Sequence, residues 1–529
     1  MVENILILGN GFDLAMGRKT SYEDFLRFLN SLSFLLYCQK VYNQQIDVKN
    51  YDFLLKEFDD ILGDSESNPG EDFQKELDFY KSLSDKGKLG ILLECLSKFD
   101  PDMRVLDILS KRIRNYREKL LSILKSIMEE EVDIESKYLP DVEIIDDLIQ
   151  KTDKEYKWLL EIRDNYFLKY INENKQKLGK KWSSIELVIS DIAEAIVFYK
   201  KSGSIDSDIR AESNYTALKY LKDNIEDFVK DNIEDFVRDN IEDFVKDNKG
   251  DSASVYLQVL ADSGFQKIMD MYNEKFIQAL EELTDYLEFY LTYLDKLDFE
   301  KQEIEKKRSN LDAIEGLEKA KVLTFNYTDT AKRLFSIPEE NTHFIHGRID
   351  FARDKKSINT MVFGIEDKED KEDKEDKEEK TENINPDLIS YQKFYQRIIK
   401  ETGSDYRKFF ENPKDSGKSV DDMNIIVFGH SVDPLDKEIF KKCFKLAEER
   451  GGKYKFIFNY YDEKAKREIV KNLTIILGKE KMILLTAEQK VAFVKCDDVE
   501  KMRKELIKLK KWKSKSKTHQ KTFMKLSFF

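Results

Sequence analysis

Short apolar runs that stop at glycine or polar residues occur at the two ends of this chain and scarcely in between. The first eight residues end in ILIL and are followed by Gly9-Asn10-Gly11, which predicts a buried strand and a tight turn. Comparable runs return only near Lys321, as VLTFNYT, HFIHG, TMVFGI, NIIVFGHS and YKFIFNYY, with helical stretches between several of them. This alternation predicts an α/β fold, a Rossmann-like and mostly parallel sheet whose first strand is remote in sequence from the others.

A helix is expected after the glycine loop. Thr20 and Glu23 have the spacing of a capping box. The apolar residues that follow recur at helical spacing: Phe25, Phe28, Leu29 and Leu32. The chain is therefore predicted to open with a strand, a glycine loop and a helix.

The central part of the chain has a different pattern. From residue 31 to residue 310, polar and apolar residues alternate at helical spacing with almost no β-branched runs, and only 7 prolines occur in the whole chain. We interpret this part as a large all-α insertion that splits the sheet domain. The predicted division is as follows: 1–30, first part of the Rossmann-like domain; 31–310, helical insertion; 311–500, remainder of the domain; 501–529, basic tail.

Two repeats are present. The octapeptide DNIEDFVK recurs over residues 223–246. Eight residues of a helix make about two full turns and a further 80°, so the apolar residues of successive units point in different directions and cannot share one apolar face. We interpret it as a tandem duplication in an exposed helix. An EDK repeat at 366–380 is too charged to be buried and predicts a solvated loop.

Charge and cysteine content exclude several classes of function. The net charge of −14 gives no global attraction to nucleic acid or anionic lipid, so the sequence carries no strong nucleic-acid signal. The 4 cysteines are far apart and form no C-x-x-C pair, which argues against a zinc module or a disulfide framework, and no metal site is expected. No apolar run is long enough to span a membrane, and we expect a cytoplasmic protein.

Three clusters of residues could carry chemistry. The first is the loop after the opening strand, where a G-x-G turn lets the backbone approach a phosphate, although simple turn chemistry explains it equally well. The second follows VLTF and HFI, and the third follows NIIVF, at the strand ends where α/β sheets bind ligands. The candidate residues are Gly9, Asn10, Gly11, Asp13 and Gly17; Thr324, Asn326 and His346; and Gly429, His430, Ser431 and Asp433, with Asp436 in the same third cluster. A structural role for each histidine and glycine is the alternative.

Taken together, the clusters resemble a known family. GNGFDLAMG resembles the glycine-rich opening of sirtuin-type NAD-binding domains, with Asp13 in the position of a serine, and TFNY, HG and VFGHSVDP resemble their later motifs. More closely, ILGNGFDLAMGRKTSYEDFL, FNYTDT, IHG and FGHSVDPLD are similar to the bacteriophage abortive infection AbiH family. The resemblance covers about residues 1–30 and 325–465 and none of the insertion.

The resemblance implies a reaction. In sirtuin-like domains the nicotinamide–ribose bond of NAD breaks, an asparagine at the position of Asn326 orients the ribose and its attacking group, and a histidine at the position of His346 takes a ribose hydroxyl proton. By the same resemblance, Gly9, Gly11 and the following helix would hold the diphosphate, and Gly429 and Ser431 would line the adenosine side. Because the four-cysteine module of protein deacylases is absent, water is the expected acceptor, which makes the chain a candidate NAD glycohydrolase. The aspartate at position 13 would repel a diphosphate unless Arg18, Lys19 or a hydrogen-bonded ribose offsets its charge.

Four hypotheses result. The first is an antiphage defence protein that binds and hydrolyses NAD on infection, with the insertion as sensor of a phage-derived trigger or as homo-oligomer interface. The second is a non-catalytic nucleotide-binding switch. The third is a nuclease effector, although no arginine lies five to seven residues before any of the 4 histidines, as helical ribonucleases require. The fourth is a helical scaffold with a degenerate α/β remnant.

Overall fold

A computed structural model describes most of the sheet domain and part of the helical insertion. The described ranges are residues 2–29, 141–151, 165–174, 182–202, 215–224, 253–353, 359–365, 385–411 and 421–508, with Leu32, Ile162 and Ile209. The octapeptide repeat, apart from its first two residues, the EDK repeat and the tail beyond residue 508 lie outside these ranges.

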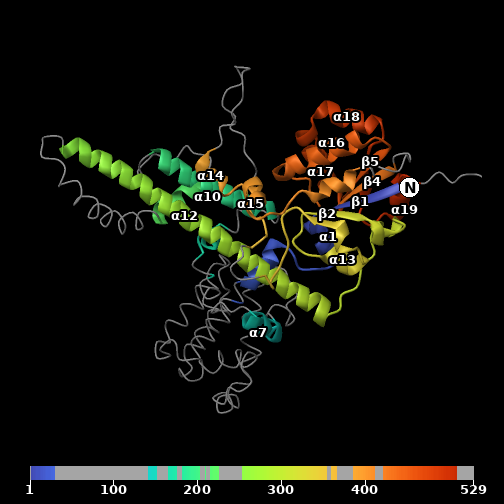
Figure 1. Ribbon diagram of the computed structural model, residues 1–529, viewed down its shortest axis with the longest axis horizontal. Coiled ribbons are helices and arrows are strands. Elements are labelled where there is room, and N and C mark those ends of the chain that lie inside the picture. Colours follow the sequence, from blue (N-terminus) through green and yellow to red (C-terminus); the bar gives the residue numbers. More distant parts are fainter. Residues whose placement is uncertain are drawn as a thin grey trace, which may run out of the picture.

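A single parallel sheet organises the domain (Figure 1). Its strands are β1 (Val2–Leu8), β2 (Lys321–Thr324), β3 (Thr342–Phe344), β4 (Asp422–Phe428), β5 (Tyr454–Tyr460) and β6 (Val491–Lys495). The spatial order is β3-β2-β1-β4-β5-β6, and every neighbouring pair is parallel. This is the strand order of the doubly wound Rossmann fold, and it confirms the predicted fold class, with the N-terminal strand at the centre.

The sheet is buried on both faces because alternate residues of each strand point in opposite directions. In β1, Ile5 and Ile7 belong to one apolar core, whereas Leu6 and Leu8 belong to another. The first core is closed by α16 (Lys437–Arg450), α17 (Glu463–Leu477) and α18 (Lys479–Ala487). The second is closed by α1 (Asn10–Ala15), α13 (Thr330–Phe335) and α19 (Val499–Glu505). Continuous apolar strands such as NIIVF are the consequence of this double coverage.

The described part of the insertion is helical, as predicted. It contains α7 (Val142–Lys151), α9 (Tyr166–Glu173), α10 (Trp182–Ser202), a helical segment at 215–224 and the long α12 (Ala253–Asp295), which continues into π-helix at Lys296–Lys301. These helices share a third apolar core, and α12 crosses the molecule beside the sheet domain (Figure 1). Two short helices from the connection between β3 and β4, α14 (Pro386–Ile389) and α15 (Lys393–Ile399), lie near α10.

The helix after the glycine loop packs into the core of the insertion. Residues 22–29 are helical, and the Phe25 and Phe28 rings lie 5.7 and 4.8 Å from the Tyr290 ring of α12. This segment therefore joins the two parts of the molecule.

Three details differ from the sequence-based expectation. Ser21 caps the helix instead of Thr20, since its Oγ accepts from the Asp24 N–H and donates to the Asp24 carboxylate. TMVFGI forms one isolated bridge instead of a strand, because its amides pair with the His346 carbonyl and a glutamine side chain. The strand VAFVK, at Val491–Lys495, was not among the predicted runs.

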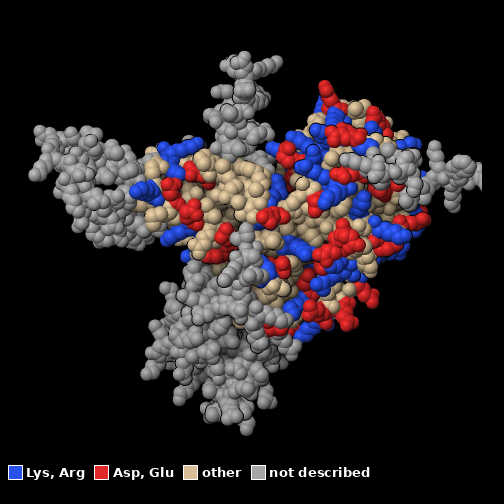
Figure 2. Space-filling model, in the orientation of Figure 1, with Lys and Arg blue, Asp and Glu red and all other residues tan. Residues whose placement is uncertain are grey.

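Short 3₁₀ turns connect the larger elements, at Asn310–Ala313, Leu317–Lys319, Glu339–Asn341, Asp405–Phe410 and Pro434–Asp436. Within the described ranges, no helix combines the length and apolar character needed to cross a membrane. On the face shown in Figure 2, basic and acidic side chains are interspersed over the helices that cover the sheet.

Candidate functional site

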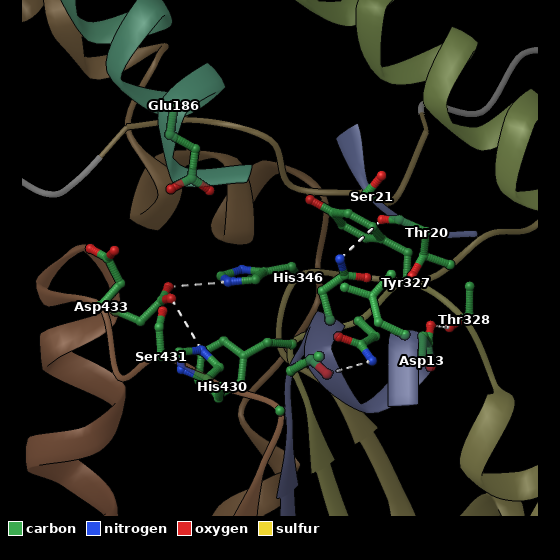
Figure 3. Close-up of a pocket in the computed structure, with 18 of the residues that line it drawn as sticks. Asp13, Thr20, Ser21, Glu186, Tyr327, Thr328, His346, His430, Ser431 and Asp433 are labelled. Carbon is green, nitrogen blue, oxygen red and sulfur yellow. Dashed lines mark hydrogen bonds and ion pairs between the residues drawn. The ribbon is translucent and has the colours of Figure 1, made fainter. Parts of the chain in front are cut away.

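A cavity of about 350 Å³ lies at the carboxyl ends of the strands, at the topological switch point between β1 and β4, from which the strand order runs outward in both directions. In doubly wound folds this position binds the ligand. The lining comes from the loops after the strands and from the insertion: Gly9, Asn10, Gly11, Asp13, Leu14, Thr20, Ser21, Glu186, Leu291, Phe325, Asn326, Tyr327, Thr328, His346, Phe363, Lys393, Gly429, His430, Ser431, Asp433 and Asp436. Figure 3 shows Glu186, Asp433, Ser431 and His430 on one side of His346, and Asp13, Thr20, Ser21 and Thr328 on the other.

Two glycine loops touch each other at the base of the cavity. The Gly9 and Gly11 amides donate to the carbonyls of Phe428 and Gly429, at 3.1 and 2.8 Å. Gly429 has φ +73°, and a Cβ there would lie 2.0 Å from the Phe12 nitrogen. The glycines are thus required by the contact between the loops, and the amides of Gly9 and Gly11 are already engaged, so they cannot also donate to a diphosphate.

Asp13 is a buried carboxyl group at the start of α1. Its Oδ2 accepts from Thr328 at 2.5 Å, whereas its Oδ1 has no partner among the described residues. Burial raises the pKa of Asp13, and the nearby Arg18 charge and the threonine hydroxyls oppose this increase. Asp13 Oδ1 is therefore a buried acceptor without a partner among the described residues, in a residue that lines the cavity.

A hydrogen-bond chain connects Asp13 to the end of α12. Thr328 accepts from Thr330 at 3.1 Å, and Thr330 accepts from Arg18 at 2.6 Å. Arg18 also binds Asp295 at 2.5 Å and Asp298 at 2.8 Å, with its side chain wholly inaccessible. Arg18 thus balances carboxylates of the insertion.

Asn326 is held in a defined orientation after β2. Its amide Nδ2 donates to the Gly9 carbonyl at 3.1 Å, and its backbone N–H donates to Thr324 Oγ1 at 3.0 Å. The side chain is 7% exposed and lines the cavity, whereas Thr324 supports it from behind. This arrangement leaves Oδ1 as an acceptor for a ligand hydroxyl or a water.

His346 is the central group of the site. It is 5% exposed, its Nε2 lies 3.3 Å from Asp436 Oδ1, and its Nδ1 has no partner among the described residues. Burial lowers the pKa of His346 to about 4, although the hydrogen bond to Asp436 opposes this change. At neutral pH the ring is therefore uncharged. With the Nε2 proton directed at the carboxylate, Nδ1 keeps a lone pair and can act as a base.

His430 contacts the same carboxylate. Its Nδ1 accepts the Val432 N–H at 2.8 Å, so Nε2 carries the proton and faces Asp436 Oδ2 at 3.4 Å. The Phe325 ring packs against both imidazoles, at 5.4 Å from His346 and 4.3 Å from His430. His430 thus fixes the Asp436 carboxylate, which in turn orients His346.

A lysine and a second carboxylate complete the cluster. Lys393, at the start of α15, lies 3.2 Å from Asp436 Oδ1 and 2.9 Å from Glu186 Oε1 of α10. Burial alone would lower the pKa of Lys393, but the two carboxylates raise it above its ordinary value. Burial likewise would raise the pKa of Asp436, but Lys393 and the histidines lower it well below its ordinary range. Burial raises the pKa of Glu186 to about 7, with Lys393 opposing.

The structure brings most of the sequence-predicted residues together. Those that line the cavity are Gly9, Asn10, Gly11, Asp13, Asn326, His346, Gly429, His430, Ser431 and Asp433. Asp433 also accepts the Leu435 N–H at 3.1 Å as the cap of a 3₁₀ turn. Gly17 and Thr324 do not line this cavity, because Gly17 ends α1 with φ +92° and Thr324 lies behind Asn326.

Sequence reasoning placed Asp436 in the third cluster but gave it no role, and it did not select several other residues of the site. Thr328 stands inside the motif FNYTDT, so a signal for it was present. Glu186 and Lys393 belong to segments with no motif and reach the site only through the fold. Within the described ranges, no group of three or more His, Cys, Asp or Glu side chains could hold a metal ion.

Comparison with known proteins gives one finding. A family model described as bacteriophage abortive infection AbiH matches residues 5–460, which include the second half of β1, the strands β2 to β5 and every residue that lines the cavity. No curated protein and no solved structure matches the chain.

Proposed function

Because the chain belongs to the bacteriophage abortive infection AbiH family, we propose that it acts in abortive-infection defence against bacteriophage by binding NAD in the cavity and hydrolysing it. One observation carries the catalytic part of the proposal. A buried, uncharged histidine, His346, has one ring nitrogen on a carboxylate and the other unpartnered, beside Asn326 in a cavity at the ligand-binding position of a doubly wound sheet.

The reaction requires few groups. The C1′–N bond between ribose and nicotinamide breaks through an oxocarbenium-like state, a water oxygen bonds to C1′, and the water gives up one proton. The products are nicotinamide, ADP-ribose and that proton. His346 Nδ1 receives the proton from the attacking water or through a ribose hydroxyl, and Asn326 Oδ1 holds the water or hydroxyl in position.

The charge of the cavity supports this orientation of the substrate. The lining includes the carboxyl groups of Asp13, Glu186, Asp433 and Asp436, against a single lysine. Such a lining favours the cationic nicotinamide ribosyl end over a diphosphate, and a carboxylate stabilises the positive charge that develops as the bond breaks. We therefore assign the ribosyl end to the interior near His346.

The test compares two variants with a matched control. Asn326→Ala and His346→Ala should each abolish nicotinamide release from NAD and protection against phage, while the protein still accumulates. His343→Ala removes another buried histidine, one that does not line the cavity, and should retain both activities. Unchanged NAD and nicotinamide in infected cells that the wild-type protein protects would overturn the hydrolase.

A second candidate function is a nucleotide-binding switch without chemistry. The hydrogen-bond chain from Asp13 through Arg18 to α12 favours it, because a ligand at Asp13 would act on a group tied to the insertion. In that case His346→Ala would still protect cells and would still bind NAD in a calorimetric titration.

A further inference from the structure

Two hydrogen-bond donors, one charged and one uncharged, compete for one oxygen atom at the centre of the site. Asp436 Oδ1 lies 3.3 Å from His346 Nε2 and 3.2 Å from Lys393 Nζ. The Lys393 charge attracts the carboxylate more strongly than the uncharged imidazole does. Without a further partner for the lysine, Asp436 would be drawn away from His346.

Glu186 supplies that further partner. Its Oε1 lies 2.9 Å from Lys393 Nζ, a shorter separation than that between Lys393 and Asp436. The Lys393 side chain is 4% exposed, so little water is present to take the place of either carboxylate. Glu186 belongs to α10, in the middle of the helical insertion, and in Figure 3 its carboxylate points toward the cavity.

We propose that Glu186 is a positioning residue of the helical insertion. Its ion pair with Lys393 weakens the attraction of that lysine for Asp436, so that the Asp436 carboxylate keeps its hydrogen bond to His346 and orients the ring. The insertion is then a structural part of the site, and a displacement of α10 would change the orientation of the catalytic base. The catalytic consequence rests on the proposed function, whereas the geometry of the relay from Glu186 to His346 does not.

Among the described residues, the groups with the largest electrostatic effect on the His346 ring all lie outside the insertion. The charged and titratable groups that face its ring are Asp436, Lys393, His430 and, at longer range, Arg397 of α15. Of the acidic residues that line the cavity, only Glu186 comes from the insertion.

The test is the tautomeric state of His346, read from the ¹⁵N shifts of its ring. The full-length chain has 4 histidines, so selective ¹⁵N-histidine labelling and single substitutions assign each signal. In the wild-type protein at about pH 8.5, above the pKa of about 7 to which burial raises Glu186, that carboxylate is charged and His346 should be a single tautomer protonated on Nε2. Glu186→Gln has the same shape and can still accept from Lys393, but it lacks the charge, so the two ring shifts should move toward the average of both tautomers.

Two further variants make the result specific. Glu194→Gln neutralises an acid on the same helix that hydrogen-bonds Ser190 and does not line the cavity, and it should leave His346 unchanged. Glu186→Asp keeps the charge and should retain more of the single tautomer than Glu186→Gln does. A His346 spectrum that is identical in wild type and folded Glu186→Gln would overturn the proposal, and thermal melting of each variant verifies folding.

Catalysis is measured separately. In Glu186→Gln the kcat for nicotinamide release should fall by about tenfold, with little change in KM, because a general base loses orientation while the substrate contacts remain. If wild-type protein releases no nicotinamide but the tautomer shift occurs, the hydrolase fails and the positioning role stands. If the reaction occurs and neither the tautomer nor kcat responds to Glu186→Gln, the positioning role fails alone.

Discussion

Acidification should leave His346 uncharged at a pH where an ordinary histidine is protonated. Burial lowers the pKa of His346 from the ordinary 6.5 to about 4. At about pH 5, a group with that pKa is protonated in roughly one molecule in ten, whereas an ordinary histidine is protonated in more than nine in ten. The difference of about 2.5 pKa units corresponds to about 3 kcal/mol.

The sign of the effect on stability follows from the same shift. The folded state binds the proton less tightly than the unfolded chain does, so the contribution of His346 is fully present above about pH 6.5. It is lost progressively as the pH falls toward 4, to a maximum of about 3 kcal/mol. Acid should therefore weaken the fold around the site before it charges the ring.

The assay is a pH titration of the imidazole Cε1–H signals in full-length protein labelled at its 4 histidines. The His346 signal should remain at its neutral position down to about pH 5. Asp436→Asn removes a carboxylate that favours the charged ring, so the midpoint should fall further in that variant. A His346 midpoint at or above about pH 6 in the wild-type protein would refute the account of a buried, uncharged base.

Other predictions test the frame around the site. Gly429→Ala should lower the free energy of unfolding by at least about 2 kcal/mol more than Gly451→Ala does, measured by thermal or urea unfolding. Both glycines have positive φ, but only a Cβ at position 429 would lie against backbone, at 2.0 Å. Equal losses for the two variants would contradict the contact between the loops. Arg18→Met should cost about 3–5 kcal/mol in the same measurement, since it leaves two buried carboxylates without a counter-charge. Arg333→Met, at a side chain that is 38% exposed, should lower the free energy of unfolding by less than about 1 kcal/mol. Similar losses for Arg18→Met and Arg333→Met would refute the stabilising role of the buried ion pairs of Arg18. Deletion of residues 366–380 should leave phage protection unchanged, and loss of protection would contradict the interpretation of the EDK repeat as a solvated loop.

The helical insertion and the sheet domain pack against each other and share the site, although the sequence divides them into separate segments. The helix at 22–29 packs against α12, Arg18 binds the end of α12, and Glu186 of α10 lines the cavity. The insertion is thus connected through hydrogen bonds and ion pairs to both sides of the site, at Asp13 and at Asp436.

The sequence by itself determined the fold class and the loops that build the site. Runs such as ILIL and NIIVF are apolar without interruption, as expected of strands that are buried on both faces of a parallel sheet. Each run stops at a turn residue, so the local pattern was sufficient to place the loops at the strand ends. Asn326, His346 and His430 were found for that reason. TMVFGI was misjudged because its amides bond to neighbours distant in sequence, which local pattern does not record.

Only the tertiary structure decided which charges meet. Glu186 and Lys393 are separated by more than 200 residues, and each stands in an ordinary charged helical sequence. Their roles arise from burial beside Asp436, where low exposure strengthens charge interactions that water would otherwise screen. The glycine loop shows the same limit. Its sequence predicted a close approach of backbone, but only the packing of Gly11 against Gly429 shows that the backbone approached is that of the protein's own second loop.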